Sequence, residues 1–287
     1  MPAVVLAVTW PLFLYRMTQK SLTSSTVPCK CVLTTTEIRD TMDALDGQAA
    51  LVTGASRGIG AEIALGLARD GADVAITYTS SEQAAANVVD QITALGRRAI
   101  AVRADSADPT AVTSAVQTAA DALGRLDVLV NNAGLVVLGP IDAITVADID
   151  QTLAVNVRAV LLAVQAAVPH MSDGGRIISI GSNVAERTPW PGGALYAGSK
   201  SALIGLTRGL ARELGPRGIT AVLVQPGPTD TDGNPGDGPQ ADRVIAHIPL
   251  GHYGQPADIA GMVVYLAGPG GRRITGTTIT IDGGFNA

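Results

Sequence analysis

Tyr196 and Lys200 are the residues of this chain whose types and spacing most clearly allow catalysis. They stand four positions apart in a segment of helical periodicity, so both side chains lie on one helix face. A tyrosine hydroxyl is a poor base at neutral pH because its reference pKa is near 10. A neighbouring cation favours the phenolate, so we expect Lys200 to lower the pKa of Tyr196 and make it a general acid/base. Lys200 is the only lysine after residue 46, which argues against a chance tyrosine–lysine neighbour.

A glycine-rich turn at residues 53–60 offers a second kind of chemistry. Its sequence, TGASRGIG, lies between an apolar β-prone run and a run with helical periodicity. Glycines at such a turn allow a tight bend, close approach of the backbone to a pyrophosphate, and close packing of helix on strand. The helix that follows presents unpaired N–H groups and a partial positive charge to a phosphate. We therefore expect a cofactor phosphate here rather than an ordinary strand–helix turn.

The elements that must position these residues begin at residue 47, where strand-like and helix-like segments start to alternate. The strand-like segments are continuously apolar, which is typical of strands buried on both faces. Alternating strands and helices predict an α/β, doubly wound, single domain at 47–287. The expected sheet is parallel and seven-stranded, with helices on both faces. The expected strands are 49–53, 73–78, 98–103, 126–131, 176–180, 219–225 and 277–281, and the helices are 59–69, 82–95, 109–123, 145–168, 195–214 and 256–267.

Composition excludes several other classes of protein. Of the 287 residues, 47% are hydrophobic and 16% are charged, which excludes a disordered chain. The net charge of −5, without any run of basic residues, disfavours a nucleic-acid binder. No apolar run reaches the roughly 18–20 residues of a membrane-spanning helix, so we expect no membrane partner. The three histidines have no metal-ligand spacing, so we expect no metal site.

Residues 1–46 differ in amino-acid composition and patterning from the rest of the chain. An apolar stretch at 4–15, broken by Pro11, is followed by a Ser/Thr-rich stretch. No basic residue precedes the apolar stretch, which disfavours a secretory signal. We expect a disordered extension, or a gene model that is too long and whose real start is Met17 or Met42. Both cysteines, Cys29 and Cys31, lie in this extension, and a cysteine-free domain suits a reducing compartment such as the cytoplasm.

Taken together, these motifs resemble those of the short-chain dehydrogenase/reductase family, in its compact single-domain form with a Rossmann-type fold. The turn has the spacing G-x-x-x-G-x-G, residues 131–134 read N-N-A-G, and residues 196–200 fit Y-x-x-x-K. Residues 226–231 resemble the family's P-G-x-x-x-T. Ser182 precedes Tyr196 by 14 residues, and Asn156 lies in the preceding helix. The resemblance is strongest to 3-oxoacyl-carrier-protein reductases and related ketone reductases.

The resemblance implies a catalytic site of four residues. Tyr196 would exchange a proton with the substrate oxygen, and Lys200 would lower the tyrosine pKa and bind the nicotinamide ribose. Ser182 would position the substrate oxygen, and Asn156 would hold a water that links Lys200 to solvent. Ser182 could instead be a turn former at a strand end, in which case Ser179 is the next candidate. Asn156 could be an ordinary polar residue of a helix.

The cofactor is expected to be NADP(H), with NAD(H) possible. An NAD site usually carries an acidic residue at the end of the second strand, and residues 76–81 contain none. Arg57 can pair with a 2′-phosphate, because a guanidinium matches phosphate geometry. The resemblance implies cofactor contacts from Gly54, Ser56, Arg57, Gly58, Ile59, Gly60, Asp105, Ser106, Asn131, Ala133, Gly134, Tyr196, Lys200, Pro226, Gly227, Thr229 and Thr231.

The substrate end is less clearly specified by the sequence. Residues 229–238 repeat Asp, Gly and Pro, which predicts a mobile lid rather than regular structure. Arg187 could meet an acidic group of a substrate, or could be a solvated rim charge. The expected pocket walls suggest an uncharged or apolar carbonyl compound; they are Val136, Val137, Val184, Trp190, Leu195 and Tyr253.

The leading functional hypothesis is an NADPH-dependent oxidoreductase that reduces a ketone to a secondary alcohol, as 3-oxoacyl-carrier-protein reductases do. One alternative is an NAD(P)-dependent alcohol, sugar or steroid dehydrogenase that works oxidatively. Another is a non-catalytic dinucleotide sensor on the same fold. The resemblance further implies a homotetramer or homodimer, assembled through the helix at 195–214 and the last strand.

Overall fold

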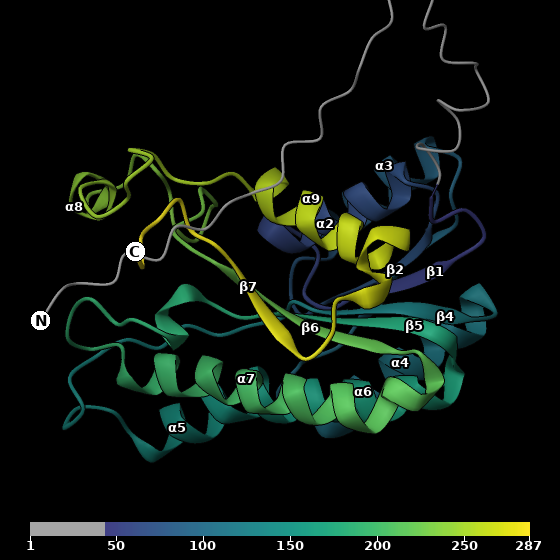
Figure 1. Cartoon of the computed structure of the whole chain (residues 1–287), viewed down its shortest axis with the longest axis horizontal. Coiled ribbons are helices and arrows are strands. Elements are labelled where there is room, and N and C mark those ends of the chain that lie inside the picture. Colours follow the sequence, from purple (N-terminus) through teal and green to yellow (C-terminus); the bar gives the residue numbers. More distant parts are fainter. Residues whose placement is uncertain (1–43) are drawn as a thin grey trace, which may run out of the picture.

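The computed structural model describes residues 44–287, which form a parallel sheet between two layers of helices (Figure 1). The seven strands are all parallel and lie in the order β3-β2-β1-β4-β5-β6-β7. This confirms the predicted α/β, doubly wound architecture. The strands are β1 (Ala49–Val52), β2 (Asp73–Tyr78), β3 (Ala99–Arg103), β4 (Leu126–Asn131), β5 (Met171–Ile180), β6 (Thr220–Pro226) and β7 (Thr277–Ile281).

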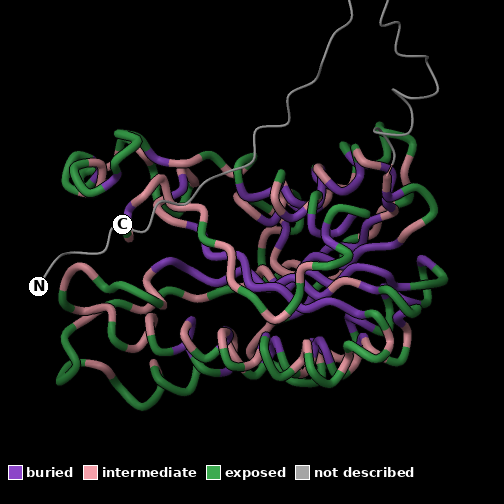
Figure 2. The backbone as a smooth tube through the Cα atoms, viewed as in Figure 1, coloured by how far each residue is buried: buried purple, intermediate pink, exposed green. Residues whose placement is uncertain are grey.

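The helices cover both faces of the sheet, as its apolar strands require (Figure 1). One face carries α2 (Gly58–Arg69), α3 (Glu82–Ala94) and α9 (Pro256–Ala267). The other carries α4 (Pro109–Leu123), α6 (Ala159–Ala167) and α7 (Ala194–Leu214). Figure 2 shows the strands as the most buried part of the molecule, between the two layers. Two shorter helices, α5 (Val146–Leu153) and α8 (Ala241–Ile245), lie at one end of the sheet.

Parallel strands bring all their carboxyl ends to the same edge of a sheet, and this edge holds the candidate site. The segments that follow β1, β4, β5 and β6 meet there, although they are far apart in the sequence. The predicted glycine turn follows β1, the N-N-A-G segment follows β4, and Ser182 follows β5. The fold therefore gathers the predicted site residues at one edge.

The expected single helix at 145–168 is divided in the structure. Helix α5 passes into a π-helical turn, Ala154–Arg158, before α6 continues and ends in a 3₁₀ turn, Val168–His170. Strand β5 also begins at Met171 rather than 176, and α8 was not expected. A π turn inserts one residue into a helix without needing Gly or Pro, so apolar periodicity alone does not reveal it.

The domain takes in a few residues before position 47. Leu45 is fully buried in the core, and its N–H donates to the oxygen of Asp70 over 2.8 Å. Asp46 forms an ion pair with Arg97 at 2.7 Å. The other expectations for the N-terminal segment, including its disorder and an alternative start, concern residues 1–43 and lie outside the described residues.

One described stretch, Val146–His170, is long and apolar enough to cross a membrane by length and composition, and half of it is buried. The stretch spans α5, the π turn and α6, whose inner face packs on the sheet and on α4. A core helix passes the same test, so this feature alone gives little support for a membrane span.

Candidate active site

The glycine turn is held against the N-N-A-G segment by its backbone. Gly54 has a φ of +63°, and a Cβ built on it would lie 2.8 Å from the Ala133 Cα. A Cβ on Gly60 would lie 2.4 Å from the Asn132 side-chain nitrogen. Real side chains do not tolerate such approaches, so both positions require glycine. The turn and the end of β4 therefore form one rigid surface.

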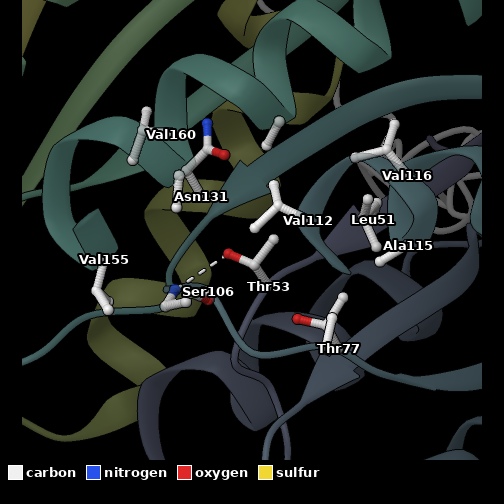
Figure 3. Close-up of a pocket in the computed structure, with 14 residues that line it drawn as sticks. Leu51, Thr53, Thr77, Ser106, Val112, Ala115, Val116, Asn131, Val155 and Val160 are labelled. Atoms are coloured by element: carbon white, nitrogen blue, oxygen red, sulfur yellow. Dashed lines mark hydrogen bonds between the residues drawn. The ribbon is translucent and has the colours of Figure 1, made fainter. Parts of the chain in front are cut away.

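Two residues that the sequence analysis gave no role fix this surface. The Asn132 Nδ2 donates to the backbone oxygens of Thr53 (2.9 Å) and Gly54 (3.0 Å). The Thr53 hydroxyl accepts from the backbone N–H groups of Asn132 (3.0 Å) and Ala133 (3.1 Å), the latter drawn as a dashed line in Figure 3. Thr77 adds a fifth bond, accepting from the Gly54 N–H over 3.0 Å. The position of Thr53, a polar residue at the end of an apolar strand, is the sequence feature that could have indicated its role.

The start of α2 is open to a phosphate. The helix begins at Gly58, and no side chain of the preceding residue, Arg57, caps it. Arg57 is exposed, and its guanidinium has no hydrogen bond or ion pair within residues 44–287. Ser56 and Ile59 are partly exposed on either side. An uncapped helix start beside an unpaired guanidinium fits the anionic cofactor that the sequence predicts.

Three of the expected cofactor residues line one small cavity of about 20 Å³ between β1, β4 and α4 (Figure 3). They are Ser106, Asn131 and Ala133. The Asn131 Nδ2 contacts the Ser179 hydroxyl at 3.4 Å, whereas its buried Oδ1 has no partner among the described residues. Buried polar atoms are normally hydrogen-bonded, so this oxygen fits a donor from a bound group. Asp105 is exposed beside the cavity, and its carboxylate accepts from the Ala107 N–H.

Tyr196 and Lys200 lie close together on the inner part of α7. Lys200 is only 4% exposed, and its Nζ lies 6.0 Å from the centre of the Tyr196 ring. The same amine donates to the oxygen of Ile180, at the end of β5, over 2.9 Å. Gly134 lies beside it, since a Cβ built there would be 3.3 Å from Nζ. Burial lowers the pKa of Lys200 to about 8.

The structure corrects the expected direction of the tyrosine pKa. Burial raises the pKa of Tyr196 above its ordinary value, and a hydrogen bond with Ser182 opposes this rise. Desolvation penalises the phenolate, and the Lys200 amine is directed at a backbone oxygen. Ser182 itself is buried at the end of β5, where it precedes the 3₁₀ turn Asn183–Ala185. Its effect on the pKa of Tyr196 favours Ser182 over Ser179 as the partner of the phenol.

Asn156 occupies the π-helical turn and connects three segments. Its Nδ2 donates to the Leu135 oxygen and to the Ser199 hydroxyl, both at 2.9 Å. Its Oδ1 accepts from the Leu135 N–H over 2.8 Å. This side chain therefore braces the segment after Gly134 against α7. π turns are frequent at functional sites, and the relay role implied for Asn156 stays a prediction.

The loop that follows Ser182 is fastened to the C-terminus, a contact that the sequence did not predict. The Asn286 Nδ2 donates to the Asn183 oxygen over 2.8 Å, and the Asn183 Nδ2 contacts the Asn286 Oδ1 at 3.4 Å. Arg187 donates to the Phe285 oxygen over 2.8 Å. Phe285 is buried and packs edge-on against Trp190, with ring centres 5.8 Å apart. We call the contacts between residues 183–190 and 285–286 the C-terminal clasp.

The segment after β6 passes over the glycine turn. The Thr231 methyl lies 3.6 Å from a Cβ built on Gly58, and the buried Thr229 hydroxyl donates to the Gly227 oxygen. Pro226 ends β6, and Gly227 packs so closely on Asp282 that a Cβ would clash. Helix α8 then packs on the clasp, where His247 meets Trp190 edge-on at 5.4 Å. The structure thus brings the predicted cofactor and catalytic residues to one edge, and mobility of the lid stays a prediction.

Comparisons with known proteins agree with this geometry. A family model described as enoyl-(acyl carrier protein) reductase matches residues 54–286. A short-chain dehydrogenase from Burkholderia cenocepacia, crystallised with NADP, is 59% identical, with a TM-score of 0.84 over 85% of this chain and all of that chain. A blue fluorescent protein from a metagenomic library, crystallised with NADPH, is 55% identical, with the same TM-score and coverage.

A relative with a different name is the cyclic-di-GMP-binding biofilm dispersal mediator protein of Escherichia coli. It is 45% identical over 246 residues, which cover 86% of this chain and 100% of the relative. The NADP-bound neighbours support the predicted preference for NADP(H). The chain is an NAD(P)-dependent oxidoreductase and belongs to the short-chain dehydrogenase/reductase family.

Proposed function

We propose that this protein uses NADPH to reduce a ketone to a secondary alcohol, with Tyr196 as the proton donor. The observation that carries the proposal is the cluster of the half-buried Tyr196 with the buried Ser182 and Lys200 at the carboxyl edge of the sheet. Reduced nicotinamide, when bound, supplies the hydride that adds to the carbonyl carbon and is itself oxidised. Tyr196 delivers the proton to the carbonyl oxygen as the C=O π bond breaks, and solvent restores its proton.

The raised pKa of Tyr196 suits its proposed role as the proton donor in reduction. A phenol whose pKa lies above its ordinary value stays protonated and can act as an acid. Alcohol oxidation would need the phenolate, which the buried site disfavours. Ser182 would orient the substrate oxygen toward the phenol, and the Lys200 ammonium would stabilise the phenolate that forms. The oxidative reading as an alcohol, sugar or steroid dehydrogenase therefore remains the second choice.

The cofactor would be held by residues from four strand ends and from α7. The N-terminus of α2 and Arg57 would meet phosphates, and Ser106 with Asn131 would border the adenosine part. Lys200 would bind the nicotinamide ribose, and Thr229 with Thr231 would lie against the nicotinamide. The rigid junction of Gly54 with Ala133 supports this assignment, because it leaves the backbone open to close approach.

Replacement of one hydroxyl tests the proposed function. We expect Tyr196→Phe to lower kcat for NADPH-dependent ketone reduction at least about 100-fold, the scale of general acid catalysis. NADPH binding, followed by nucleotide fluorescence, should change less than about twofold, because the ring and Lys200 remain. Tyr265→Phe on the exposed side of α9 is the matched control and should keep wild-type kinetics. Full activity of Tyr196→Phe would refute the role of the phenol.

The third hypothesis, a non-catalytic dinucleotide sensor, can be distinguished from the enzyme by an activity assay. A sensor would bind NADPH but would reduce no ketone in a panel of keto esters, quinones, keto sugars and steroids. The intact set of Asn156, Ser182, Tyr196 and Lys200 supports turnover. We further propose a cytoplasmic location, and a homotetramer or homodimer built on α7 and β7.

A further inference from the structure

We propose that the active site selects electrically neutral, apolar ketones, and that it disfavours anionic substrates such as coenzyme A thioesters or ketones on an acidic carrier protein. This inference rests on the proposed ketone reduction and specifies its substrate class. Three segments carry it, and we call them the mouth segments: residues 135–153, 183–195 and 227–255.

The mouth segments adjoin the catalytic cluster and contact one another. The first follows Gly134, whose neighbour is the Lys200 amine, and the second follows Ser182. They meet where the Gly139 N–H donates to the Gly192 oxygen over 2.9 Å. The third follows β6 and reaches the second through the contact of His247 with Trp190. Figure 1 shows α5 and α8, which belong to the first and third segments, at the same end of the molecule.

The charge of the molecule is concentrated in these segments. They contain eight carboxylates and two arginines, a formal charge of −6, whereas the whole chain carries −5. The rest of the chain therefore sums to +1. None of the eight forms an ion pair within residues 44–287. The eight are Asp142, Asp148, Asp150, Glu186, Asp230, Asp232, Asp237 and Asp242.

Both arginines of the mouth segments already contact other groups of the protein. Arg187 donates to the Phe285 oxygen in the C-terminal clasp. Arg243 lies over the Trp190 ring, with its guanidinium carbon 5.2 Å from the ring centre. Arg187, which the sequence places as a possible partner of an acidic group, has one of its guanidinium nitrogens bound to the Phe285 backbone oxygen. The cofactor phosphates differ in this respect, because α2 and Arg57 face them outside the mouth segments.

The same segments expose large apolar side chains. Val136, Leu138, Ile141 and Leu250 are between 58% and 74% exposed. Single exposed apolar residues need no explanation, but four on segments that adjoin one catalytic cluster favour an apolar ligand. An electrostatic field of one sign changes the rate at which a charged ligand meets a protein by a factor of about 10 to 1,000. The negative field of the mouth segments would lower this rate for an anionic substrate. Apolar contact with charge repulsion thus defines the substrate class.

The test compares two substrates with the same reacting group. The acetoacetyl thioester of N-acetylcysteamine is neutral, whereas acetoacetyl-coenzyme A carries several phosphate charges. At low salt we expect kcat/KM to be at least about tenfold higher for the neutral thioester. The difference should shrink as salt rises, because the screening length falls from about 30 Å at 0.01 M to about 8 Å at 0.15 M. Equal values at low salt, or a preference for the coenzyme A thioester, would overturn the proposal.

Charge removal gives an independent check. The variant Asp142→Asn/Asp150→Asn/Glu186→Gln should raise kcat/KM for acetoacetyl-coenzyme A severalfold and leave the neutral thioester unchanged. The matched control Glu82→Gln/Asp90→Asn/Asp121→Asn removes three exposed carboxylates from α3 and α4 and should change neither value. Equal effects of the two variants would overturn the role of the mouth segments. A protein that reduces neither thioester nor any other ketone would instead fail the proposed function.

Discussion

The environment of Lys200 shows how one buried charge can set the chemistry of its neighbours. Its amine is almost completely removed from solvent, contacts the Ile180 oxygen, and lies near the Tyr196 ring. Burial destabilises both the ammonium and the phenolate when each is alone, which explains the opposite pKa shifts of the two groups. As Tyr196 gives up its proton to a substrate, the two charges appear together, and their attraction is strong where water is excluded.

This arrangement predicts a pH dependence of reduction. Because the pKa of Lys200 lies at about 8, the amine is mostly charged at neutral pH and loses its charge as the pH rises through that value. The forming phenolate then loses its stabilising partner, so kcat/KM should fall above about pH 8. Lys200→Met should be at least about 100-fold slower at pH 7 and should lack this fall. Rate measurements from pH 6 to 10 test both statements, and a decline near pH 8 that persists in Lys200→Met would contradict the assignment.

At the scale of elements, the sequence predicts the strands and most helices because apolar periodicity and Gly or Pro boundaries mark them. The π turn at Ala154–Arg158 escapes such reasoning, since no residue there breaks the helical pattern. Strand β5 begins before Gly174 and Gly175, which read as a turn in the sequence. The opposite pKa shifts of Tyr196 and Lys200 could not be predicted from the sequence for a related reason. The burial that causes them depends on segments that meet only in the folded chain. The motif residues themselves were predictable because their spacing is local.

The C-terminal clasp is a long-range contact that no local pattern reveals, and it predicts an effect on catalysis. Asn286→Ala removes its bonds to the main chain and side chain of Asn183, next to Ser182. The loss of these two part-buried hydrogen bonds, about 1.4 kcal/mol in all, corresponds to about tenfold. We expect kcat for ketone reduction to fall by that factor while KM for NADPH changes less than about twofold.

The control for the clasp is Asn87→Ala on the exposed side of α3, where Asn87 accepts a hydrogen bond from Gln83. It should leave both constants unchanged. Thermal unfolding of Asn286→Ala separates local positioning from a general loss of structure. If Asn286→Ala loses kcat and NADPH affinity equally, the clasp supports the fold as a whole rather than Ser182.

At the scale of the whole molecule, the two helical layers differ in what they leave exposed. The layer of α5, α6 and α7 exposes Val146, Leu153 and Leu161. On α7, Cβ atoms built on Gly205 and Gly209 would meet nothing within 4 Å, so a second helix can approach closely there. The other layer exposes fewer large apolar residues, among them Leu95 and Tyr265. This face is apolar, and α7 within it has glycines that leave room for a second helix. Both features favour association of two or more copies of the chain through this face.

The assembly can be tested with two matched substitutions. Leu161 on α6 and Leu95 at the end of α3 are each 45% exposed, so a change of either to glutamate alters a similar surface. Burial of a leucine side chain in an interface contributes about 1.5–3 kcal/mol to association. In a symmetric oligomer, a substitution removes this contribution at every equivalent interface. By light scattering after gel filtration, we expect a tetramer or dimer for the wild type. Leu161→Glu should give smaller species, whereas Leu95→Glu should keep the wild-type mass. A monomeric wild type, or dissociation by Leu95→Glu alone, would place any interface elsewhere, and the exposed face of α5–α7 would then need another explanation.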